Sequence, residues 1–333
     1  MNWTRPGLSI AIVLATIAPG HAQSVEDFYR GRTVTILVGF TAGGGYDLYA
    51  RVLGRHLGRH IPGNPQVVVQ NMPGAGSLKA TQYVYGVATK DGTVLASVSR
   101  GMATEPLLND AKFDATKLTW IGSVTSETSI CATWHTSKTK TWDDMFKREF
   151  TLGGSATGAD PDTFALILRN VFGAKVRLVT GYPGGNDINL AMERGEVDGR
   201  CGWSWSSLKS QKQWLPQINV LAYFAVERNA EVQGQWTIER AKDNEQRQVL
   251  RLLTAGQFLG RPFFSTPELP ADRKAALRAA FEATMKDEQF LAEAKKIDME
   301  VTPVAGQTID AFLVDLYAAP QDVVVKAKAA IQK

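Results

Sequence analysis

Apolar and polar positions fall into two alternating kinds of segment along most of the chain. Residues 33–40 form an unbroken apolar and β-branched run, which is typical of a strand buried on both faces of a sheet. In the next segment, 47–60, apolar side chains recur at helical spacing. The same alternation continues through 66–70 (strand), 77–88 (helix) and 93–99 (strand). Strands that alternate with helices in this way predict a parallel α/β sheet.

The alternation starts again after a different kind of segment. Residues 120–135 and 218–224 are extended, β-rich runs, which we interpret as strands that cross between two lobes. Between them, strands and helices are expected at 149–153, 161–172, 176–180, 186–194 and 197–203. Further helices are expected at 244–254, 271–285, 287–297 and 320–332, the last on the surface of the first lobe. The predicted first lobe is 23–123 plus 225–333, and the second is 124–224.

The first 22 residues have the pattern of a secretory signal. Arg5 supplies a charge, an uncharged and mostly apolar run follows at 8–18, and Gly20-His21-Ala22 places small residues before a cut at Gln23. The run is too short to span a bilayer, and no later segment reaches the about 18 apolar residues that a span requires. The sequence therefore predicts an exported chain, with an uncleaved anchor as the alternative.

Charge and cysteine content narrow the class of protein. The formal net charge is +4, and the basic residues are dispersed among acidic ones, so no nucleic-acid footprint is visible. This balance is compatible with an anionic ligand. The chain has 2 cysteines, Cys131 and Cys201, and an oxidising compartment favours their pairing. Two separately buried thiols are the alternative.

A glycine-rich turn after the first strand is the first candidate site. A strand that enters a helix through glycines exposes backbone N–H groups at the positive end of the helix dipole, which suits an anion. The turn has neither the Gly-Lys-Ser/Thr of a phosphate loop nor the G-x-G-x-x-G of a dinucleotide site. A tight turn with Asp47 as helix cap is the alternative reading. The candidate residues are Thr41, Ala42, Gly43, Gly44, Gly45, Tyr46 and Asp47.

A second turn, at 155–160, has similar chemistry. Ser155, Thr157 and the amides of Gly158 and Ala159 can donate hydrogen bonds, and Asp160 can cap the following helix. The turn is not a nucleophile elbow, because Thr157 occupies the last glycine position of that motif. We therefore expect binding rather than catalysis here.

Three further features have two readings each. Arg100, at the end of a predicted strand, is a ligand contact or an exposed and unpaired charge. Trp203 either belongs to the core or forms a wall of the cleft. His56 and His60 have metal-ligand spacing, but the arginines beside them would repel a cation, so neither a metal nor a cofactor is predicted.

Several short motifs, in order along the chain, resemble one known family. They are the stretches 39–51, 67–77 (with Asn71-Met72-Pro73-Gly74-Ala75-Gly76), 90–95, 153–160, 182–185, 195–198, 260–263 and 269–273. Together they resemble the substrate-binding component of tripartite tricarboxylate transporters, also called Bug receptors. The resemblance covers nearly all of the chain after residue 22.

The resemblance implies a type II periplasmic-binding-protein fold, in which two α/β lobes joined by crossover strands close over a ligand. It implies an organic carboxylate held largely by backbone amides, delivery to membrane permease subunits, a monomeric receptor without cofactor, and Tyr182 at the edge of the site. It also places the strands of Cys131 and Cys201 side by side, so that a disulfide is expected. Tyr46 and Arg100 depart from the family pattern. A periplasmic enzyme or a sensor subunit with the same fold stays an alternative.

Overall fold

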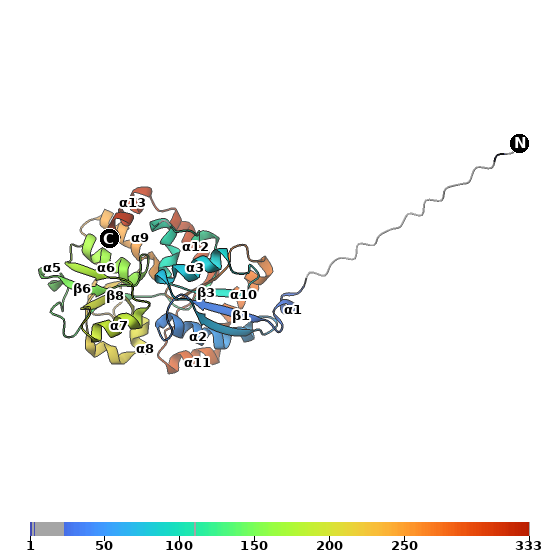
Figure 1. The fold of residues 1–333 in the computed structure, drawn as a ribbon, viewed down its shortest axis with the longest axis horizontal. Helices are drawn as coiled ribbons and strands as arrows, with labels where there is room; N and C mark the ends of the chain where they lie inside the picture. Colours follow the sequence, from blue (N-terminus) through green and yellow to red (C-terminus); the bar gives the residue numbers. More distant parts are fainter. Residues whose placement is uncertain (2, 4–22, 110, 333) are drawn as a thin grey trace.

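The computed structural model describes residues 1, 3, 23–109 and 111–332, and Figure 1 draws them as two α/β bodies side by side. The predicted signal segment therefore lies almost wholly outside the described residues. Each body is built around a six-stranded sheet with its own strand order. We call the two bodies the first and the second lobe, after the order of their sheets in the chain.

The first sheet has the order β12-β4-β11-β3-β1-β2. Its central strand β1, Thr33–Val38, pairs in parallel with β2 and β3, which explains its continuous apolar sequence. The antiparallel strand β11 lies between β3 and β4. The remaining bounds are β2 Gln66–Asn71, β3 Val94–Ser97, β4 Thr119–Ser123, β11 Pro262–Ser265 and β12 Val304–Ala305.

Helices cover this sheet at positions close to those the sequence predicts. The helix α2, Gly45–Leu57, packs on β1 and β2 and is covered in turn by α10 and α11. The helix α12, which the apolar pattern did not reveal, packs on β4. The other bounds are α1 Val25–Tyr29, α3 Leu78–Gly86, α4 Glu105–Leu108, α10 Ala271–Thr284, α11 Glu288–Lys296 and α12 Gly306–Tyr317.

The second sheet has the order β10-β9-β5-β8-β6-β7. The strand β5, Ser129–Trp134, is antiparallel to both of its neighbours β8 and β9, whereas β6, β7 and β8 run parallel to one another. The strand bounds are β6 Phe150–Gly153, β7 Val176–Val179, β8 Gly199–Ser204, β9 Ile218–Phe224 and β10 Gln235–Trp236. The helices are α5 Asp144–Lys147, α6 Asp160–Asn170, α7 Gly185–Glu193 and α8 Trp205–Ser210.

A disulfide joins Cys131 of β5 to Cys201 of β8, across 70 residues of sequence. Both cysteines are completely buried. The bond is therefore a buried cross-link between two neighbouring strands in the middle of the second sheet.

The last helix connects the lobes. The helix α13, Gln321–Ala330, packs against α9, Asn244–Thr254, and also contacts α4 and α6. The Asn170 side chain of α6 donates hydrogen bonds to the carbonyl oxygens of Ala330 and Gln332, at 3.0 and 2.8 Å. The last helix thus contacts elements of both lobes (Figure 1), which the sequence pattern did not predict.

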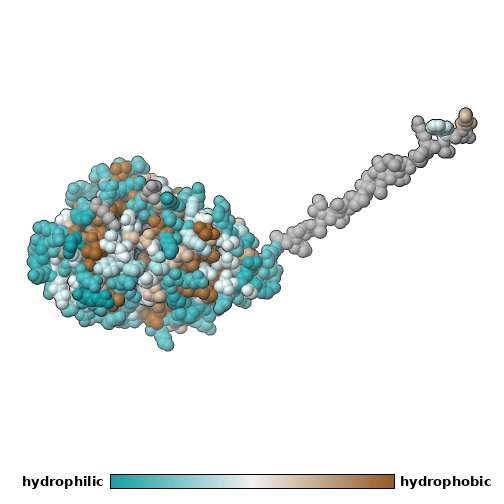
Figure 2. All heavy atoms as spheres, in the orientation of Figure 1, coloured by the Kyte–Doolittle hydropathy of each residue, from teal (hydrophilic) through white to brown (hydrophobic). Residues whose placement is uncertain are grey.

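The surface carries no single large apolar region on the face shown in Figure 2, where apolar residues form several separate spots among polar ones. Among the described residues, no helix is both long enough and apolar enough to cross a membrane.

Candidate functional site

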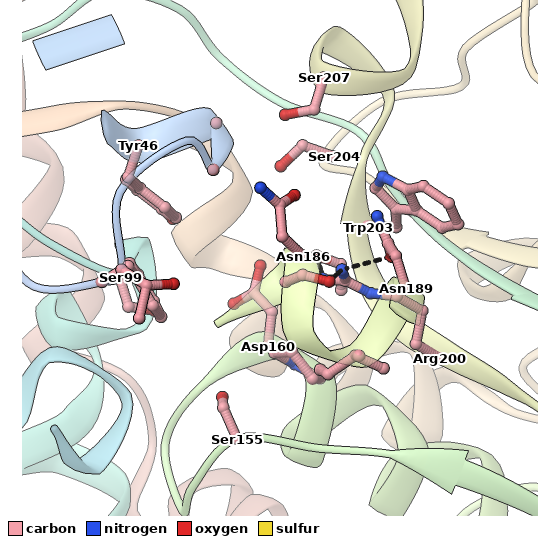
Figure 3. Close-up of a pocket in the computed structure, with 18 of the residues that line it drawn as sticks. Tyr46, Ser99, Ser155, Asp160, Asn186, Asn189, Arg200, Trp203, Ser204 and Ser207 are labelled. Atoms are coloured by element: carbon pink, nitrogen blue, oxygen red, sulfur yellow. Dashed lines mark hydrogen bonds between the residues drawn. The ribbon is translucent and has the colours of Figure 1, made fainter. Parts of the chain in front are cut away.

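A cavity of about 70 Å³ lies where the two lobes meet, and Figure 3 shows the side chains around it. Tyr46 and Ser99 of the first lobe lie on one side, Arg200 and Trp203 of the second on the other, with Asn186 between them. The lining consists of Phe40, Thr41, Gly44, Gly45, Tyr46, Ser99, Arg100, Ser155, Asp160, Pro161, Gly185, Asn186, Ile188, Asn189, Arg200, Gly202, Trp203, Ser204, Ser207, Gln211 and Arg261.

Three helices begin at the wall of this cavity. The helix α2 begins at Gly45, α6 at Asp160 and α7 at Gly185, and all three residues line the cavity. None of the three N-caps uses a side chain to accept a hydrogen bond from the first turn. Unpaired N–H groups and the positive ends of three helix dipoles therefore surround the space, an arrangement that favours an anion.

Arg100 connects the two lobes at the back of the cavity. Its side chain is buried, and its Nε lies 3.1 Å from a carboxylate oxygen of Asp160 and 3.1 Å from the hydroxyl of Tyr46. The two Nη atoms donate to Gln257, at 3.0 Å, and to Ser204, at 2.6 Å. Burial by itself lowers the pKa of Arg100, but Tyr46 and Asp160 raise it above its ordinary value. Arg100 is therefore a charged group, fully paired with the protein itself.

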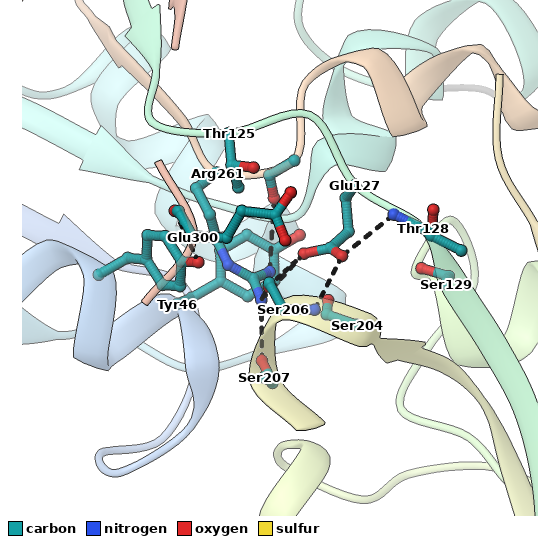
Figure 4. Close-up of polar contacts among 12 residues, drawn as sticks. Tyr46, Thr125, Glu127, Thr128, Ser129, Ser204, Ser206, Ser207, Arg261 and Glu300 are labelled. Atoms are coloured by element: carbon teal, nitrogen blue, oxygen red, sulfur yellow. Dashed lines mark hydrogen bonds and ion pairs between the residues drawn. The ribbon is translucent and has the colours of Figure 1, made fainter. Parts of the chain in front are cut away.

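Arg261 occupies a second buried position, shown in Figure 4. Its Nη2 donates to the hydroxyls of Ser207, at 2.9 Å, and Ser206, at 3.1 Å, and lies 3.4 Å from a carboxylate oxygen of Glu127. Its guanidinium carbon lies 4.7 Å from the ring centre of Tyr46. Glu127 lies in the segment that crosses from β4 to β5, so this pair also ties the first lobe to the start of the second.

Arg200 differs from the other two arginines. It lies on β8 and is 5% exposed, and its Nη1 donates to the carbonyl of Gly185, at 2.7 Å, and to the side-chain oxygen of Asn189, at 3.1 Å. Its guanidinium carbon lies 5.3 Å from the ring centre of Trp203. Burial lowers the pKa of Arg200 to about 10, and Asp160 offsets only part of this effect.

The hydrogen-bond partners of Arg200 are all neutral, so they do not balance its charge. Arg100 pairs with Asp160 and Arg261 with Glu127, whereas no carboxylate of the described residues forms an ion pair with Arg200. A buried charge held by neutral groups is costly unless a counter-charge arrives. Arg200 thus gives the cavity a positive charge that Asp160, already paired with Arg100, compensates only in part.

Two buried polar atoms of the lining add to this picture. The hydroxyl oxygen of Ser155 and the Nε of Arg261 have no hydrogen-bond partner within the described part of the chain. Buried polar atoms are nearly always hydrogen-bonded in folded proteins. Both atoms belong to residues that line the cavity, so a bound molecule could satisfy them.

The structure brings part of the predicted site to the cavity. The predicted residues that line it are Thr41, Gly44, Gly45, Tyr46, Arg100, Ser155, Asp160 and Trp203. They come from both glycine-rich turns, from the end of β3 and from β8. The reading of Arg100 as an exposed and unpaired charge is wrong, because the side chain is buried and paired.

The other predicted residues lie outside the lining, namely Ala42, Gly43, Asp47, Thr157, Gly158, Ala159 and Tyr182. Asp47 is buried behind the first turn, where it accepts a hydrogen bond from the Gly43 amide, at 2.8 Å, and pairs with Arg51. Gly158 has φ +79°, and a side chain there would collide with the carboxylate of Glu105. Asp47 and Gly158 therefore shape the turns.

Eight lining residues with polar side chains were not predicted, namely Ser99, Asn186, Asn189, Arg200, Ser204, Ser207, Gln211 and Arg261. A signal for Arg200 existed in the sequence, since it is a charged residue within an otherwise uncharged strand. For Arg261, the Gly-Arg-Pro-Phe motif was noticed without a role for its arginine.

Metal binding finds no support among the described residues, where no group of three His, Cys, Asp or Glu side chains converges. His56 lies 2.6 Å from a carboxylate oxygen of Glu293, and His60 lies 2.7 Å from one of Asp287. Both histidines therefore attach α2 and its 3₁₀ extension to α11.

Relatives by sequence match parts of the chain, and no protein-family model matches it. A UPF0065 protein of Agrobacterium vitis is 30% identical over 201 residues, which is 58% of this chain and 57% of that protein. The BugT protein of Bordetella pertussis is 41% identical over 100 residues, 30% of this chain and 29% of BugT. The chain thus spans between about a third and just over half of the length of the curated relatives it matches.

Solved structures match over nearly the whole chain. The periplasmic binding protein BugD superposes with a TM-score of 0.72 at 19% identity, covering 92% of this chain and 100% of BugD. MatC of Rhodopseudomonas palustris, solved with bound malate, has a TM-score of 0.69 at 17% identity, covering 90% and 99%. Another R. palustris protein, solved with adipate, has a TM-score of 0.68 at 19% identity, covering 89% and 97%. The chain therefore has the two-lobed fold of the Bug- and TctC-type periplasmic binding proteins, as its motifs indicate.

Proposed function

We propose that this protein is a periplasmic receptor that captures a small organic carboxylate between its lobes and delivers it to the permease subunits of a tripartite tricarboxylate-type transporter. It does so as a monomer and carries out no chemistry on the ligand. The lobes are 23–123 plus 225–333 and 124–224, and the signal segment 1–22 is removed on export.

One observation carries the proposal most directly: Arg200, buried and without an ion-pair partner among the described residues, lines a cavity between the lobes. A ligand carboxylate would supply the counter-charge that the protein lacks, through charge-assisted hydrogen bonds. The three helix N-termini at the same wall would add N–H donors. An acid bound there touches both lobes, so binding favours the closed arrangement through contacts that the open one cannot make.

The relatives support the same function. Two structures of this fold were solved with malate and with adipate, both of them carboxylates. Because their sequences are distant from this chain, the likeness shows a common fold. That this chain also binds a carboxylate is part of the proposal.

An enzyme with this fold is the alternative function. The described residues of the cavity include several serines but neither histidine, lysine nor cysteine, so a serine there lacks the usual basic partner. Asp160, the carboxylate in the lining, is engaged by Arg100. These features favour binding over catalysis.

The experiment is a ligand screen on the exported full chain. Mass spectrometry of the periplasmic protein gives the N-terminus, expected at Gln23, and identifies any co-purified acid. Titration calorimetry with that acid and with a carboxylate panel is expected to show saturable binding, and chromatography to recover the ligand unchanged. Conversion of the ligand, or the absence of binding across the panel, would overturn the proposal.

A further inference from the structure

We propose that the cavity selects an acid with a single negative charge, and that Arg200 holds this charge. The inference rests on the proposed function and goes beyond it, because the similar structures named above hold dicarboxylates. The three arginines around the cavity differ in whether they already have a carboxylate partner within the protein.

Two of the three arginines are paired inside the protein. The side chains of Arg100 and Asp160 are 2% and 10% exposed, and the Nε of Arg100 lies 3.1 Å from a carboxylate oxygen of Asp160. Arg261 and Glu127 are 1% and 2% exposed and lie 3.4 Å apart. A ligand carboxylate that approached either pair would meet an arginine whose charge is already balanced, and would be repelled by its partner carboxylate. The Nε of Arg261, which has no partner among the described residues, is therefore left for a neutral acceptor of the ligand.

The third arginine has room for one counter-charge. Arg200 uses Nη1 on Gly185 and Asn189, while its Nη2 makes only one long contact, 3.4 Å to the carbonyl of Gly202. The Trp203 ring lies against the guanidinium and limits the side from which an acid can reach it. One carboxylate therefore completes the charge balance of the cavity.

A second carboxylate would have no full counter-charge. A helix N-terminus offers an anion only a partial positive charge, which does not repay the removal of a whole carboxylate from water. The remaining groups that face the cavity are neutral, among them the unpaired hydroxyl of Ser155 and the amide of Asn186. They suit a hydroxyl, a carbonyl or an amide on the rest of the ligand.

The size of the cavity limits the length of the ligand. Its volume of about 70 Å³ is small beside the about 300–1,000 Å³ of pockets that hold drug-sized ligands. Ile188, Phe40 and Trp203 supply apolar wall between the polar groups. The expected ligand is a short monocarboxylate whose remainder is uncharged.

The test uses matched acids on the unaltered full chain. Calorimetry compares each monocarboxylate from acetate to octanoate with the dicarboxylate of the same carbon count, and 3-hydroxybutyrate with malate. We expect the better monocarboxylates to bind at least about tenfold more tightly than their dicarboxylate partners. Arg200→Gln should weaken monocarboxylate binding about 10- to 100-fold, as expected for the loss of one or more hydrogen bonds to a charged group. Arg200→Lys should recover part of this loss.

Arg177→Gln is the matched control, because Arg177 lies on β7 of the same sheet with its side chain 64% exposed. It should bind like the unaltered protein. If dicarboxylates bind as tightly as their partners, the inference is wrong and the proposed function stands. If no acid of either series binds, the proposed function fails with it. An unchanged affinity in Arg200→Gln would remove Arg200 from the site, and if that variant does not fold, Arg200→Lys and the matched acids still decide.

Discussion

Arg200 illustrates how one buried side chain sets the charge of a cavity. The guanidinium is buried among neutral groups, which destabilises its charged form and lowers its pKa to about 10. At neutral pH the group is still charged, so the cavity attracts an anion. A bound carboxylate favours the charged form and therefore raises the pKa of Arg200 again.

This shift predicts proton uptake on binding. Near pH 10, Arg200 is about half protonated in the free protein and fully protonated in the complex, so binding should take up about half a proton. Near pH 7 the same reaction should take up almost none, and above pH 10 the affinity should fall. Calorimetry at both pH values, in buffers of different ionisation enthalpy, measures the uptake, and equal values at the two would contradict the prediction.

The pair of Arg100 and Asp160 gives a second prediction. Arg100→Ala leaves the Asp160 carboxylate buried without its cation, so the free energy of unfolding should fall by about 3–5 kcal/mol. Adding Asp160→Asn should recover part of this loss, because the amide oxygen can still accept from Gln257 and Ser129. Urea denaturation of the two single variants and the double variant measures the coupling. Strictly additive losses would show that the two side chains do not stabilise each other.

Individual lining residues were only partly predictable from the sequence. Tyr46 and Asp160 follow from the glycine-rich turns, because a strand end and a helix start must lie at the edge of a parallel sheet. Arg200 was missed because a single charge in a strand usually points to solvent. Its burial depends on the start of α7, a neighbour that only the folded chain supplies.

At the scale of elements, helix α11 illustrates how the surface of the first lobe is held together. Asp287 is its N-cap and accepts hydrogen bonds from the amides of Gln289 and Phe290. Burial tends to raise the pKa of Asp287, but His60, the Phe290 amide and Arg59 outweigh it and keep the pKa below its ordinary value. The carboxylate form of Asp287 therefore stabilises the fold.

Asp287→Ala should lower the free energy of unfolding by about 1 kcal/mol at pH 7, through the lost cap. Asp287→Asn keeps a capping side chain and should lose less. Because the folded pKa is depressed, the contribution is complete above the unfolded value near pH 4 and fades as the pH falls below it. Urea denaturation at pH 7 and at pH 3 tests this. An alanine effect of equal size at both pH values would rule out the carboxylate as its source.

Predicted and observed elements agree best where the apolar pattern is long. The strand 218–224 and the helix 244–254 have the predicted bounds. The strand β11 and the helix α12 were missed. The strand β11 has only four residues and begins with a proline, so its sequence shows no periodicity. It forms a strand because β3 and β4 flank it. Short elements depend on their neighbours more than on their own sequence.

On the scale of the whole molecule, the disulfide should contribute substantially to stability. It closes a loop of 70 residues, which corresponds to about 4 kcal/mol in the chain-entropy model. The double variant Cys131→Ala/Cys201→Ala should therefore unfold at a lower urea concentration than the oxidised protein. Reductant during unfolding should destabilise the unaltered protein and leave the double variant unchanged. Equal midpoints for the two proteins without reductant would contradict a stabilising bond.

The two-lobed architecture was visible in the alternation of strands and helices and in the ordered motifs. The contacts between the lobes were not, because residues such as Gln257 and Ser204 are ordinary until folding places them opposite Arg100. The path of α13 across both lobes has the same origin.

Arg100 is part of the cavity wall and at the same time part of the contact between the lobes. Under the proposed function, an acid seated between the lobes leaves when they move apart, and this movement must break the bonds of Arg100 to Asp160 and Ser204. The residence time of the ligand is then set by the lifetime of these bonds as well as by the strength of the ligand's own contacts. A membrane partner could hasten unloading by loosening one arginine, without touching the acid.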